Sequence, residues 1–380
     1  MSRVASGRRK ICFVLPSLAG GGAERAAVQI LNALDPAAWD RSMYLFTREG
    51  PYLADVSSSV RVDGGEQPSR VGRWRALRRF VIETRPEIVV SFLSYFTVLS
   101  AVRAARVGAR VVFNQQTPMS AFLADGDYPW RRRWHRRLFT IATRAGYAAA
   151  DLVVATSQGV ADDLVAAFGV ARARVRVVHN PVDLDAVAAA AQEPLDPAHA
   201  ARWRRPVIVA AGRLAEAKNY PLLIEALALL RQRVAARLFI LGQGDEEQPI
   251  RALVAARGLD DAVTLCGFQS NPWKYIARAD VFALTSHYEG FGNVLVEAMA
   301  CGIPVVATRS SGTIDIVRDG VDGLLIERHE PAAVAAALER ILGDEAVRLR
   351  LSNEARAGAG RFALPVIGAA YDGVLRGALA

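Results

Sequence analysis

Short apolar runs alternate with helical patterns along this chain, and this alternation constrains its fold more than any other feature. The first half contains six expected strands, at residues 11–15, 41–47, 87–92, 109–113, 152–156 and 174–179. The second half contains six more, at residues 206–210, 237–241, 262–266, 281–284, 304–307 and 323–326. Strands that alternate with helices in this way predict doubly wound parallel sheets, an α/β fold class.

Residues 183–205 interrupt the alternation, because they are rich in Ala, Asp and Pro and poor in residues that favour strands. We therefore expect two Rossmann-like domains, one over residues 1–186 and one over residues 187–361, facing each other across a cleft. Ligands of such sheets bind at the carboxyl ends of the strands, where the distinctive loops of this chain fall.

The composition suits a globular protein with two well-buried cores: 380 residues, 52% of them hydrophobic and 22% charged. The three cysteines, Cys12, Cys266 and Cys301, are widely spaced and lie in expected strands or at a helix end. This pattern favours reduced core thiols over a disulfide framework or a metal site, and it predicts a cytoplasmic location.

No apolar run approaches the roughly 20 residues that a membrane-spanning helix needs, so we expect no integral membrane segment. Near the start, the basic residues 8–10 and the apolar residues 11–15 imitate a signal peptide. The apolar part is short, however, and is followed by Pro16 and by glycines at 20–22. These residues favour the first strand and turn of a Rossmann-like domain.

Positive charge is concentrated in the first half of the chain. Residues 1–187 hold 26 Lys and Arg against 16 Asp and Glu, whereas the rest of the chain holds 21 against 22. Two segments are densest in arginine: RVGRWRALRR, from Arg70 to Arg79, and WRRRWHRRLF, from Trp130 to Phe139. Arginines interleaved with Trp and Leu are typical of a helix in an anionic lipid interface, although a solvated arginine-rich face has the same pattern. No nucleic-acid-binding module accompanies the charge, so we expect no nucleic-acid partner.

The segment 286–308, SHYEGFGNVLVEAMACGIPVVAT, carries the most chemistry. Its first glycines follow an expected strand and allow the backbone to approach a ligand closely. Asn293 is expected to cap the helix that follows, and free amides at such a helix start attract an anion, typically a phosphate. Glu289 and Glu297 would repel phosphate but are suited to bind sugar hydroxyls. The combination therefore indicates a nucleotide sugar.

Three loops that follow expected strands in the second half complete the candidate site. Arg213 and Lys218 suit a diphosphate, although a structural salt bridge would use the same residues. The turn GQGD at 242–245 is tight, but such turns are common after strands. The segment from Gly267 through Trp273 either seats a planar base or is an ordinary strand-to-helix connection.

The order of these motifs resembles the retaining glycosyltransferases of family 4, which have the GT-B architecture of two Rossmann-like domains. The segment GRL with Lys218 and Asn219 comes first, and Gly267 with Phe268 follows. EGFGNVLVE, CGIPVVAT and a glycine-rich loop come next, as in that family. The resemblance is strong over residues 206–330 and weaker in the first half, where GGGAERAAVQILNAL carries it.

The resemblance implies a role for each matching residue. Arg213 and Lys218 would neutralise the donor diphosphate. Glu297 would bind the ribose hydroxyls, and Glu289 would contact the donor sugar. The other matching positions would bind the donor: Gly21, Gly22, Gly267, Phe268, Gly290, Phe291, Gly292, Asn293 and Val294. No metal and no cofactor are implied, and a helix over residues 362–380 would cross back to the first domain.

The implied mechanism follows from charge. Breaking the anomeric bond leaves negative charge on the diphosphate, which the two cations and the helix amides would stabilise, while Glu289 offsets positive charge on the sugar. One departure concerns a histidine that many members of the family place after a strand of the first domain. This chain has VFNQQTP there, so Asn114, Gln115 and Gln116 become candidates for binding sugar or acceptor hydroxyls.

The sequence therefore predicts a cytoplasmic, metal-independent glycosyltransferase. It would move a hexose or N-acetylhexosamine from a nucleoside-diphosphate sugar to an acceptor, in polysaccharide, O-antigen or glycan assembly. The basic first half and the habit of the family favour a lipid-linked saccharide as acceptor and a peripheral position on the inner face of the cell membrane. A nucleotide-sugar epimerase and a donor-binding regulatory protein of the same fold are the alternatives.

Overall fold

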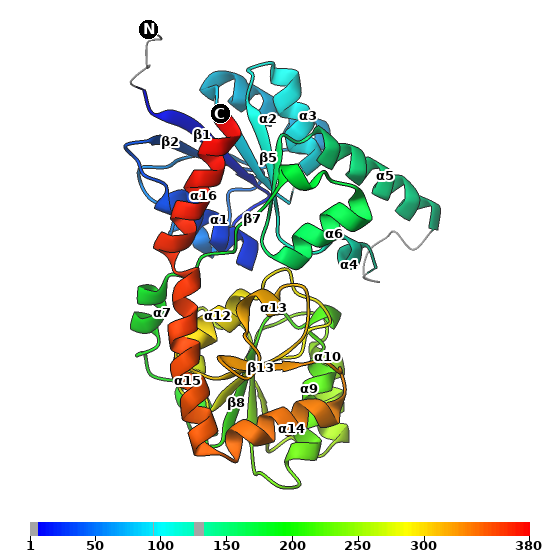
Figure 1. Ribbon diagram of the computed structural model, residues 1–380, viewed down its shortest axis with the longest axis vertical. Helices are drawn as coiled ribbons and strands as arrows, with labels where there is room; N and C mark the ends of the chain where they lie inside the picture. Colours follow the sequence, from blue (N-terminus) through cyan, green and yellow to red (C-terminus); the bar gives the residue numbers. More distant parts are fainter. Residues whose placement is uncertain (1–6, 94, 125–132) are drawn as a thin grey trace. The chain divides into compact units, whose positions relative to one another are not determined.

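The computed structural model describes residues 7–93, 95–124 and 133–380, and the side chains of all of these except 133–136 and 138. The chain forms two compact units (Figure 1). The first contains the chain up to Pro181 together with Leu364–Ala380, and the second is Val182–Ala363. The boundary expected after residue 186 lies a few residues beyond Pro181.

The first unit is built on a parallel sheet. In the described part of this unit the sheet has seven strands, in the order β3-β2-β1-β4-β5-β6-β7. Their bounds are β1 (Arg9–Leu15), β2 (Trp39–Leu45), β3 (Arg61–Gly64), β4 (Ile88–Phe92), β5 (Arg110–Gln115), β6 (Leu152–Ala155) and β7 (Val175–Val177). The strand order reverses between β1 and β4, which is therefore the topological switch point of this sheet.

Helices cover both faces of this sheet (Figure 1). They are α1 (Gly22–Ala33), α2 (Arg70–Thr84), α3 (Tyr95–Ala105), α4 (Met119–Ala124), α5 (Arg133–Ala149), α6 (Gln158–Phe168) and α16 (Leu364–Leu379). One face packs against α1 and α16, and the other against α2, α3 and α6. The hydroxyls of Ser69 and Ser157 cap α2 and α6, and Gly169, in the left-handed region, ends α6.

The last helix completes the core of the first unit. Ile367, Tyr371 and Leu375 recur every four residues along α16, and all three are buried in the cluster that α1 shares. Trp39 donates its indole N–H to the carboxylate of Asp372 over 2.5 Å. This apolar stripe covers strands that would otherwise face water.

The second unit, which is described throughout, has a six-stranded parallel sheet in the order β10-β9-β8-β11-β12-β13. Its strands are β8 (Val207–Ala211), β9 (Arg237–Leu241), β10 (Val263–Leu265), β11 (Val281–Leu284), β12 (Val305–Thr308) and β13 (Gly323–Ile326). Its helices are α7 (Leu184–Ala190), α8 (Pro197–Ala200), α9 (Tyr220–Leu230), α10 (Glu247–Ala256), α11 (Trp273–Ile276), α12 (Asn293–Ala300), α13 (Thr313–Ile316), α14 (Pro331–Leu342) and α15 (Glu345–Ala359).

The core of the second unit lies on both faces of its sheet. One apolar cluster holds residues of α9, α10 and α14, and the other holds residues of α7, α11 and α12. Every residue of β8 and of β11 is buried. This double burial explains why these strands read as continuous apolar runs rather than as alternating patterns.

The expected pair of Rossmann-like α/β units is confirmed. One strand, β3, was not expected, because RVDG contains a single apolar residue and lies at the edge of the sheet. Within the described ranges, no helix is both long and apolar enough to cross a membrane.

The cysteines are free thiols, and two of them, Cys12 and Cys266, are buried as expected. Burial raises the pKa of each cysteine, Cys301 included, to about 12. Because the thiolate is the reactive form, these side chains act as small apolar groups at neutral pH.

Candidate active site

The loops at the carboxyl ends of four strands of the second unit are joined by backbone hydrogen bonds. Leu214, after β8, donates its N–H to Gln243, after β9, over 2.9 Å. Gly242 donates to Gly267, after β10, over 2.8 Å. His287, after β11, donates to Ala217 over 2.9 Å. The loops that sequence reasoning assigned to phosphate, base and sugar therefore form one connected edge.

Glycine is required where these loops touch. A Cβ on Gly242 would lie 1.9 Å from the carbonyl oxygen of Gly212, and both residues have positive φ angles. A Cβ on Gly312, at the start of α13, would lie 2.7 Å from backbone atoms of Phe291. The turn at 242–245, which carried little information in the sequence, is therefore a close-packed neighbour of the Arg213 loop.

Lys218 and Glu289 form an ion pair at the centre of this edge. The Nζ of Lys218 donates to Oε1 of Glu289 over 2.5 Å, and the Lys218 side chain is 23% exposed. Ser286, which is fully buried, donates its hydroxyl to the same oxygen over 2.6 Å. One carboxylate oxygen thus accepts a charged and a neutral hydrogen bond.

Hydroxyl groups of two threonines and one serine bind the backbone of the segments that carry this pair. Thr285 donates to the carbonyl of Asn219 over 3.1 Å and so ties the end of β11 to the Lys218 loop. Thr308, at the end of β12, donates to the carbonyl of Ser286 over 2.6 Å. Ser311 donates to the carbonyl of Glu289 over 2.9 Å. The geometry of the ion pair is therefore fixed by neighbouring strand ends rather than by side-chain contact alone.

Glu297 lies on α12, eight residues after Glu289 along the chain, and is only 5% exposed. The indole N–H of Trp273, the first residue of α11, donates to Oε2 of Glu297 over 2.8 Å. A buried carboxylate needs such donors, because an unsatisfied charge is costly away from water. Trp273 therefore fixes the orientation of Glu297.

The predicted phosphate ligands differ in their surroundings. Arg213 is exposed and forms no ion pair with any residue that the structure describes, whereas Lys218 is already paired with Glu289. The salt-bridge alternative thus applies to Lys218 but not to Arg213.

The helix cap expected at Asn293 is wrong: Gly292, with φ 103°, occupies the cap position and Asn293 is the first residue of α12. A side chain at the cap would have been strained at this φ, so glycine takes the place of an Asn cap.

The loop after β10, one of whose expected roles is to seat a base, has an open form. Gly267 has φ 68°, and a Cβ there would meet nothing within 4 Å. Phe268 is 56% exposed, and Gln269 donates its side-chain amide to the carbonyl of Cys266 over 2.8 Å. An exposed ring beside a glycine is compatible with stacking on a planar base.

The remaining predicted donor-binding residues lie around the start of α12. Gly290 and Phe291 are buried, Phe291 being 2% exposed, and its ring packs edge-on against Phe362 at 5.3 Å. Val294 is half-buried in the first turn of α12, next to Asn293. The N-terminal turn of this helix begins four residues after Glu289 along the chain.

The candidates of the first unit lie at the carboxyl edge of its own sheet. Gly21 caps α1 and Gly22 is the first residue of that helix, which is the first helix after β1. Asn114 and Gln115 end β5 and are nearly fully buried. Asn114 donates to the hydroxyl of Tyr371 over 2.8 Å, and Gln115 accepts from Tyr147 over 2.5 Å.

Gln116 continues this network of amides. Its side chain donates to Asn114 and accepts from the amide of Asn180 over 2.9 Å. The three predicted amides therefore bind groups of the first unit in this structure, and their role toward sugar or acceptor hydroxyls stays a prediction.

Sequence reasoning missed Ser286 and Thr308 as parts of the site, and it missed the contact between Trp273 and Glu297. Ser286 stands three residues before Glu289 at a strand end, a position from which a short hydroxyl reaches the carboxylate. The sequence places Trp273 at the end of the loop that either seats a base or simply connects a strand to a helix, and it shows no partner for this residue. Its contact with Glu297 joins two helices, and no local pattern records it. In the residues that the structure describes, no three His, Cys, Asp or Glu side chains are grouped to hold a metal ion.

Comparison with known families decides the affiliation. The family described as "Glycosyl transferases group 1" matches residues 192–358, and the one described as "Glycosyltransferase Family 4" matches residues 20–186. The chain belongs to the family 4, group 1 glycosyltransferases. The two matches of this family-4 protein fall almost entirely in separate units, the second unit and the first.

Several curated proteins are similar to this family-4 chain. The N-acetylgalactosamine-N,N'-diacetylbacillosaminyl-diphospho-undecaprenol 4-alpha-N-acetylgalactosaminyltransferase of Campylobacter jejuni is 34% identical over 57% of each chain. The lipopolysaccharide core biosynthesis glycosyltransferase LpsE of Rhizobium meliloti is 34% identical over 60% of this chain and 61% of that one. The D-inositol 3-phosphate glycosyltransferase of Xylanimonas cellulosilytica is 34% identical over 64% and 60%. The match thus spans about three fifths of these relatives.

Solved structures agree on the GT-B fold of this family-4 protein. HepE of Anabaena, in complex with UDP and glucose, has a TM-score of 0.80 at 21% identity, covering 97% of this chain and 100% of that chain. Sucrose-phosphate synthase from Thermosynechococcus elongatus also has a TM-score of 0.80, at 22% identity, covering 97% and 98%. At these identities the likeness shows the fold alone.

Proposed function

We propose that this protein is a retaining glycosyltransferase that moves a sugar from a nucleoside-diphosphate sugar to an acceptor hydroxyl. The observation that carries the proposal is the ion pair of Lys218 with Glu289, in which Ser286 shares the accepting oxygen. It sets a cation for phosphate beside a carboxylate for sugar. Glu289 lies three residues before Gly292, the cap of α12, and Lys218 follows β8 in the same connection as the exposed Arg213. HepE, a structural neighbour, has been solved with UDP-glucose, which supports a donor of this class.

The proposed mechanism divides the charges between these residues. As the bond between the anomeric carbon and the phosphate oxygen breaks, Arg213, Lys218 and the amides of α12 stabilise the negative diphosphate. Glu289 offsets the positive charge on the sugar ring. The acceptor oxygen forms its bond to the anomeric carbon on the face that the diphosphate leaves, and its proton passes to the leaving phosphate oxygen. These steps need no metal ion and no cofactor.

In this proposal each carboxylate binds a different part of the donor. Glu297, held by Trp273, binds the ribose hydroxyls, and Glu289 contacts the transferred sugar. Gly267 and Phe268 border the base, and the backbone around Gly292 binds sugar and phosphate. Asn114, Gln115 and Gln116 remain candidates for the sugar or acceptor side.

We propose a lipid-linked saccharide as the acceptor and a hexose or N-acetylhexosamine as the transferred sugar. Two of the similar proteins carry names that place them in transfer to a diphospho-undecaprenol saccharide and in lipopolysaccharide core synthesis. The protein would then act in polysaccharide, O-antigen or glycan assembly, on the cytoplasmic side of the membrane.

An anionic membrane surface is the proposed partner that brings the enzyme to such an acceptor. Arg73, Arg75 and Arg79 of α2 are exposed and form no ion pair with any described residue. Ile141 of α5 is 63% exposed, and Phe139 packs at 6.5 Å from Phe96 of α3. The second expected segment runs from Trp130 to Phe139, and only the side chains of Arg137 and Phe139 in it are described. Helix α2 therefore carries this part of the proposal.

Vesicle sedimentation tests the membrane partner. Replacement of Arg73, Arg75 and Arg79 by glutamate should abolish sedimentation with phosphatidylglycerol vesicles, because anionic lipid attracts each basic residue by about 1 kcal/mol. Undiminished sedimentation of this variant at low salt would refute a membrane role for α2.

Donor consumption tests the function itself. A thermal-shift screen of uridine, guanosine and adenosine diphosphate sugars should identify a donor, because a ligand that binds only the folded state raises the melting temperature. That donor should then be consumed faster when a saccharide acceptor is added. An epimerase would convert the donor without an acceptor, and a donor-binding regulatory protein would bind it without turnover. Either result, or no stabilisation by any nucleotide sugar, would contradict the proposal.

A further inference from the structure

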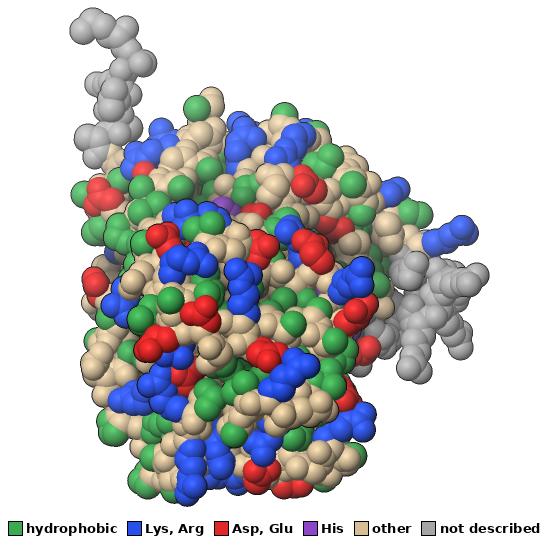
Figure 2. All heavy atoms as spheres, turned by 60° about the horizontal axis from the view of Figure 1, so that its bottom comes forward, with side chains coloured by type: hydrophobic (Ala, Val, Ile, Leu, Met, Phe, Trp, Pro, Cys, Tyr) green, Lys and Arg blue, Asp and Glu red, His purple; other side chains and the backbone are tan. Residues whose placement is uncertain are grey.

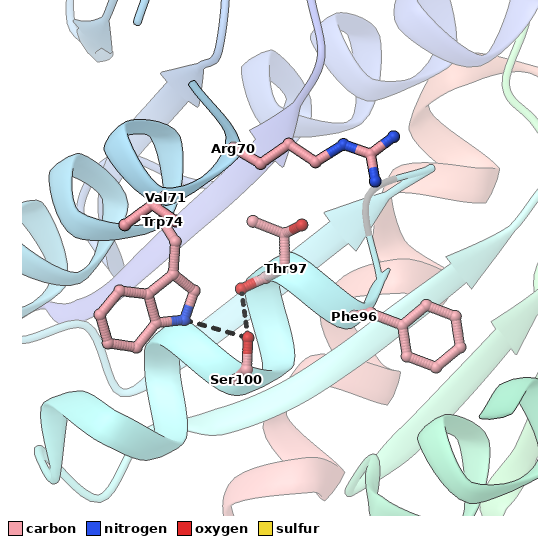
Figure 3. Close-up of a pocket in the computed structure, with 6 residues that line it drawn as sticks. All are labelled: Arg70, Val71, Trp74, Phe96, Thr97 and Ser100. Atoms are coloured by element: carbon pink, nitrogen blue, oxygen red, sulfur yellow. Dashed lines mark hydrogen bonds between the residues drawn. The ribbon is translucent and has the colours of Figure 1, made fainter. Parts of the chain in front are cut away.

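Helix α11 begins with Trp273, whose indole N–H holds the carboxylate of Glu297. A second indole hydrogen bond, in the first unit, has a different end point. There Trp74 donates to Ser100 over 3.1 Å, and Ser100 donates to the carbonyl of Thr97 on its own helix, α3 (Figure 3). That series of bonds ends on helix backbone, whereas the bond from Trp273 ends on a carboxylate that is 5% exposed. Whatever fixes α11 therefore also fixes a charged group of the candidate site.

The segment 183–205, which interrupts the alternation of strands and helices, binds the chain on both sides of α11. Asn271, two residues before this helix, donates its side-chain amide to the carbonyl of Ala190, the last residue of α7, over 2.8 Å. Arg278, two residues after the helix, donates to the carbonyl of Ala191 over 2.9 Å. The residues that flank α11 are thus bound to consecutive carbonyls at the end of α7.

Asp196, in the same segment, binds the middle of α11 with both of its carboxylate oxygens. One oxygen accepts from Nζ of Lys274 over 3.1 Å, and the other accepts from the hydroxyl of Tyr275 over 2.8 Å. Asp196 occupies the cap position of α8, where an aspartate commonly accepts from the helix backbone. Within the described part of the chain its side chain makes no such cap bond. The carboxylate is directed to α11 instead.

The direction of these hydrogen bonds follows from the protonation of the groups. The hydrogen bonds from Tyr275 and Lys274 lower the pKa of Asp196, and burial raises the pKa of Tyr275, so at neutral pH the first is charged and the second keeps its proton. Nδ1 of His199 lies 2.8 Å from the Tyr275 oxygen. Because the single phenol proton is donated to Asp196, His199 donates its Nδ1–H to this oxygen. We call these four residues the Tyr275 cluster.

The Tyr275 cluster differs from the ion pairs on the surface. On the face shown in Figure 2, basic and acidic side chains are intermingled. In the pair of Arg257 with Glu225 the two side chains are 48% and 29% exposed, and such solvated pairs contribute little to stability. In the cluster Asp196 is 47% exposed, but the groups that it binds are not: Lys274 is 13% exposed and the Tyr275 phenol is fully buried. Shielded donors of this kind fix the orientation of the helix that carries them.

We propose that the Tyr275 cluster positions Trp273 and, through it, the carboxylate of Glu297. Tyr275 lies two residues after Trp273 in α11, a helix of only four residues. So short a helix has few hydrogen bonds of its own, so the segments bound to it set its orientation. Tyr275 and Asp196 are therefore positioning residues for donor binding. The inference rests on the proposed function, in which Glu297 binds the ribose hydroxyls.

A selective loss of ribose recognition tests this role. The probes are UDP, GDP and ADP, each compared with its 2′,3′-dideoxy form and titrated calorimetrically into the full chain. The wild-type chain should bind one of the three at least about tenfold more tightly than its dideoxy form, because hydrogen bonds to the charged Glu297 are lost. Tyr275→Phe should lower this ratio of affinities at least about threefold. Binding of the dideoxy form, which has no hydroxyl for Glu297, should change less than about twofold.

Three further variants separate positioning from a general loss of charge or packing. Asp196→Ala removes the acceptor of Tyr275 and should lower the ratio as Tyr275→Phe does. Its matched control is Glu225→Ala, which removes a carboxylate paired with Arg257 in the same unit, outside the cluster, and should leave the ratio unchanged. If Tyr275 acts through Trp273, the double variant Trp273→Phe with Tyr275→Phe should match Trp273→Phe alone within about twofold.

Each outcome decides the inference. An unchanged ratio in either Tyr275→Phe or Asp196→Ala would overturn it, as would additive losses in the double variant. Equal losses for the ribose and dideoxy forms would also overturn it, because they indicate general loosening of the second unit. Binding of the dideoxy form checks that each variant is folded. If the wild-type chain binds none of the three nucleotides, the proposed function fails too, whereas a wild-type chain that prefers ribose beside unaffected variants refutes only the positioning role.

Discussion

At the residue scale, the oxygen Oε1 of Glu289 accepts hydrogen bonds from Lys218, which the proposed function assigns to the donor diphosphate, and from the hydroxyl of Ser286. We expect a diphosphate that attracts Lys218 to weaken its 2.5 Å contact with Glu289. The 2.6 Å hydrogen bond from Ser286 stays, because this serine is fully buried and its carbonyl is held by Thr308. We therefore expect Ser286 to act as a positioning residue, keeping the Glu289 carboxylate oriented when Lys218 binds phosphate.

Replacement of Ser286 tests this role. Ser286→Ala should lower kcat about tenfold, because a hydrogen bond to a charged group is lost. Binding of the nucleoside diphosphate alone should change less than about twofold, since no sugar is present to be oriented. The control is Ser311→Ala, whose hydroxyl donates to the backbone carbonyl of Glu289 and not to its carboxylate. Equal kcat values for Ser286→Ala and the wild type would rule out the positioning role.

Trp273 acts on the other carboxylate. Trp273→Phe keeps an aromatic ring but removes the N–H that donates to Glu297, so the carboxylate loses its fixed orientation. We expect the KM for the nucleotide sugar to rise about tenfold with kcat nearly unchanged. Trp203→Phe is the matched control, because its ring also packs in the core of the second unit without contacting Glu297. If both variants raise KM alike, the effect is general loosening of the core.

At the scale of elements, the sequence predicted most of the strands and the loops that matter, and the reason is burial. β8 and β11 are apolar throughout, so their positions can be predicted from the sequence. The loops after them contain Arg213 and Glu289. The edge strand β3 was missed because RVDG has no such run. The pairing of Trp273 with Glu297 joins two helices that are separated in the chain, so no local spacing records it.

Helix starts show where local rules fail. Asparagine is a common helix cap, yet Gly292 rather than Asn293 takes the cap position. The residue at this position has φ 103°, an angle that glycine adopts without strain. The need for glycine at 242 was equally hidden, since the atom that excludes a Cβ belongs to Gly212 on the neighbouring loop. The backbone angle at residue 292 and the contact between two loops at residue 242 are both set by the folded structure, and the sequence of a single segment does not reveal them.

Gly312 offers a test at this scale, because it allows α13 to approach the segment that carries Glu289. In Gly312→Ala, the new methyl group would stand 2.7 Å from backbone atoms of Phe291, which forces one of the two loops to move. We expect kcat/KM to fall at least about tenfold, since small displacements of positioned groups are costly in catalysis. Gly360→Ala is the control, because a Cβ there meets nothing and φ is −56°. Unchanged kcat/KM in Gly312→Ala would show that this contact does not hold the site.

At the scale of the whole molecule, the chain leaves the first unit after Pro181 and returns to it at Leu364. The amides at the end of β5 bind groups close to both points. Gln116 exchanges hydrogen bonds with Asn180, next to the exit, and Asn114 donates to Tyr371 on the returning helix α16. Because Gln116 also donates to Asn114, one partly buried network fixes the two passages of the chain within the first unit.

Removal of one hydroxyl tests how much this network stabilises the first unit. Tyr371→Phe keeps the ring that packs at 6.2 Å from Phe13 but leaves the Asn114 amide, which is 1% exposed, without its acceptor. We expect the free energy of unfolding of this unit to fall by about 1–3 kcal/mol, the cost of an unsatisfied buried polar group. Tyr44→Phe, at a tyrosine 3% exposed in the same unit whose hydroxyl bonds to no described residue, should cost much less. Calorimetry of both variants decides the matter. Equal stabilities would mean that the returning helix is held by its apolar stripe alone.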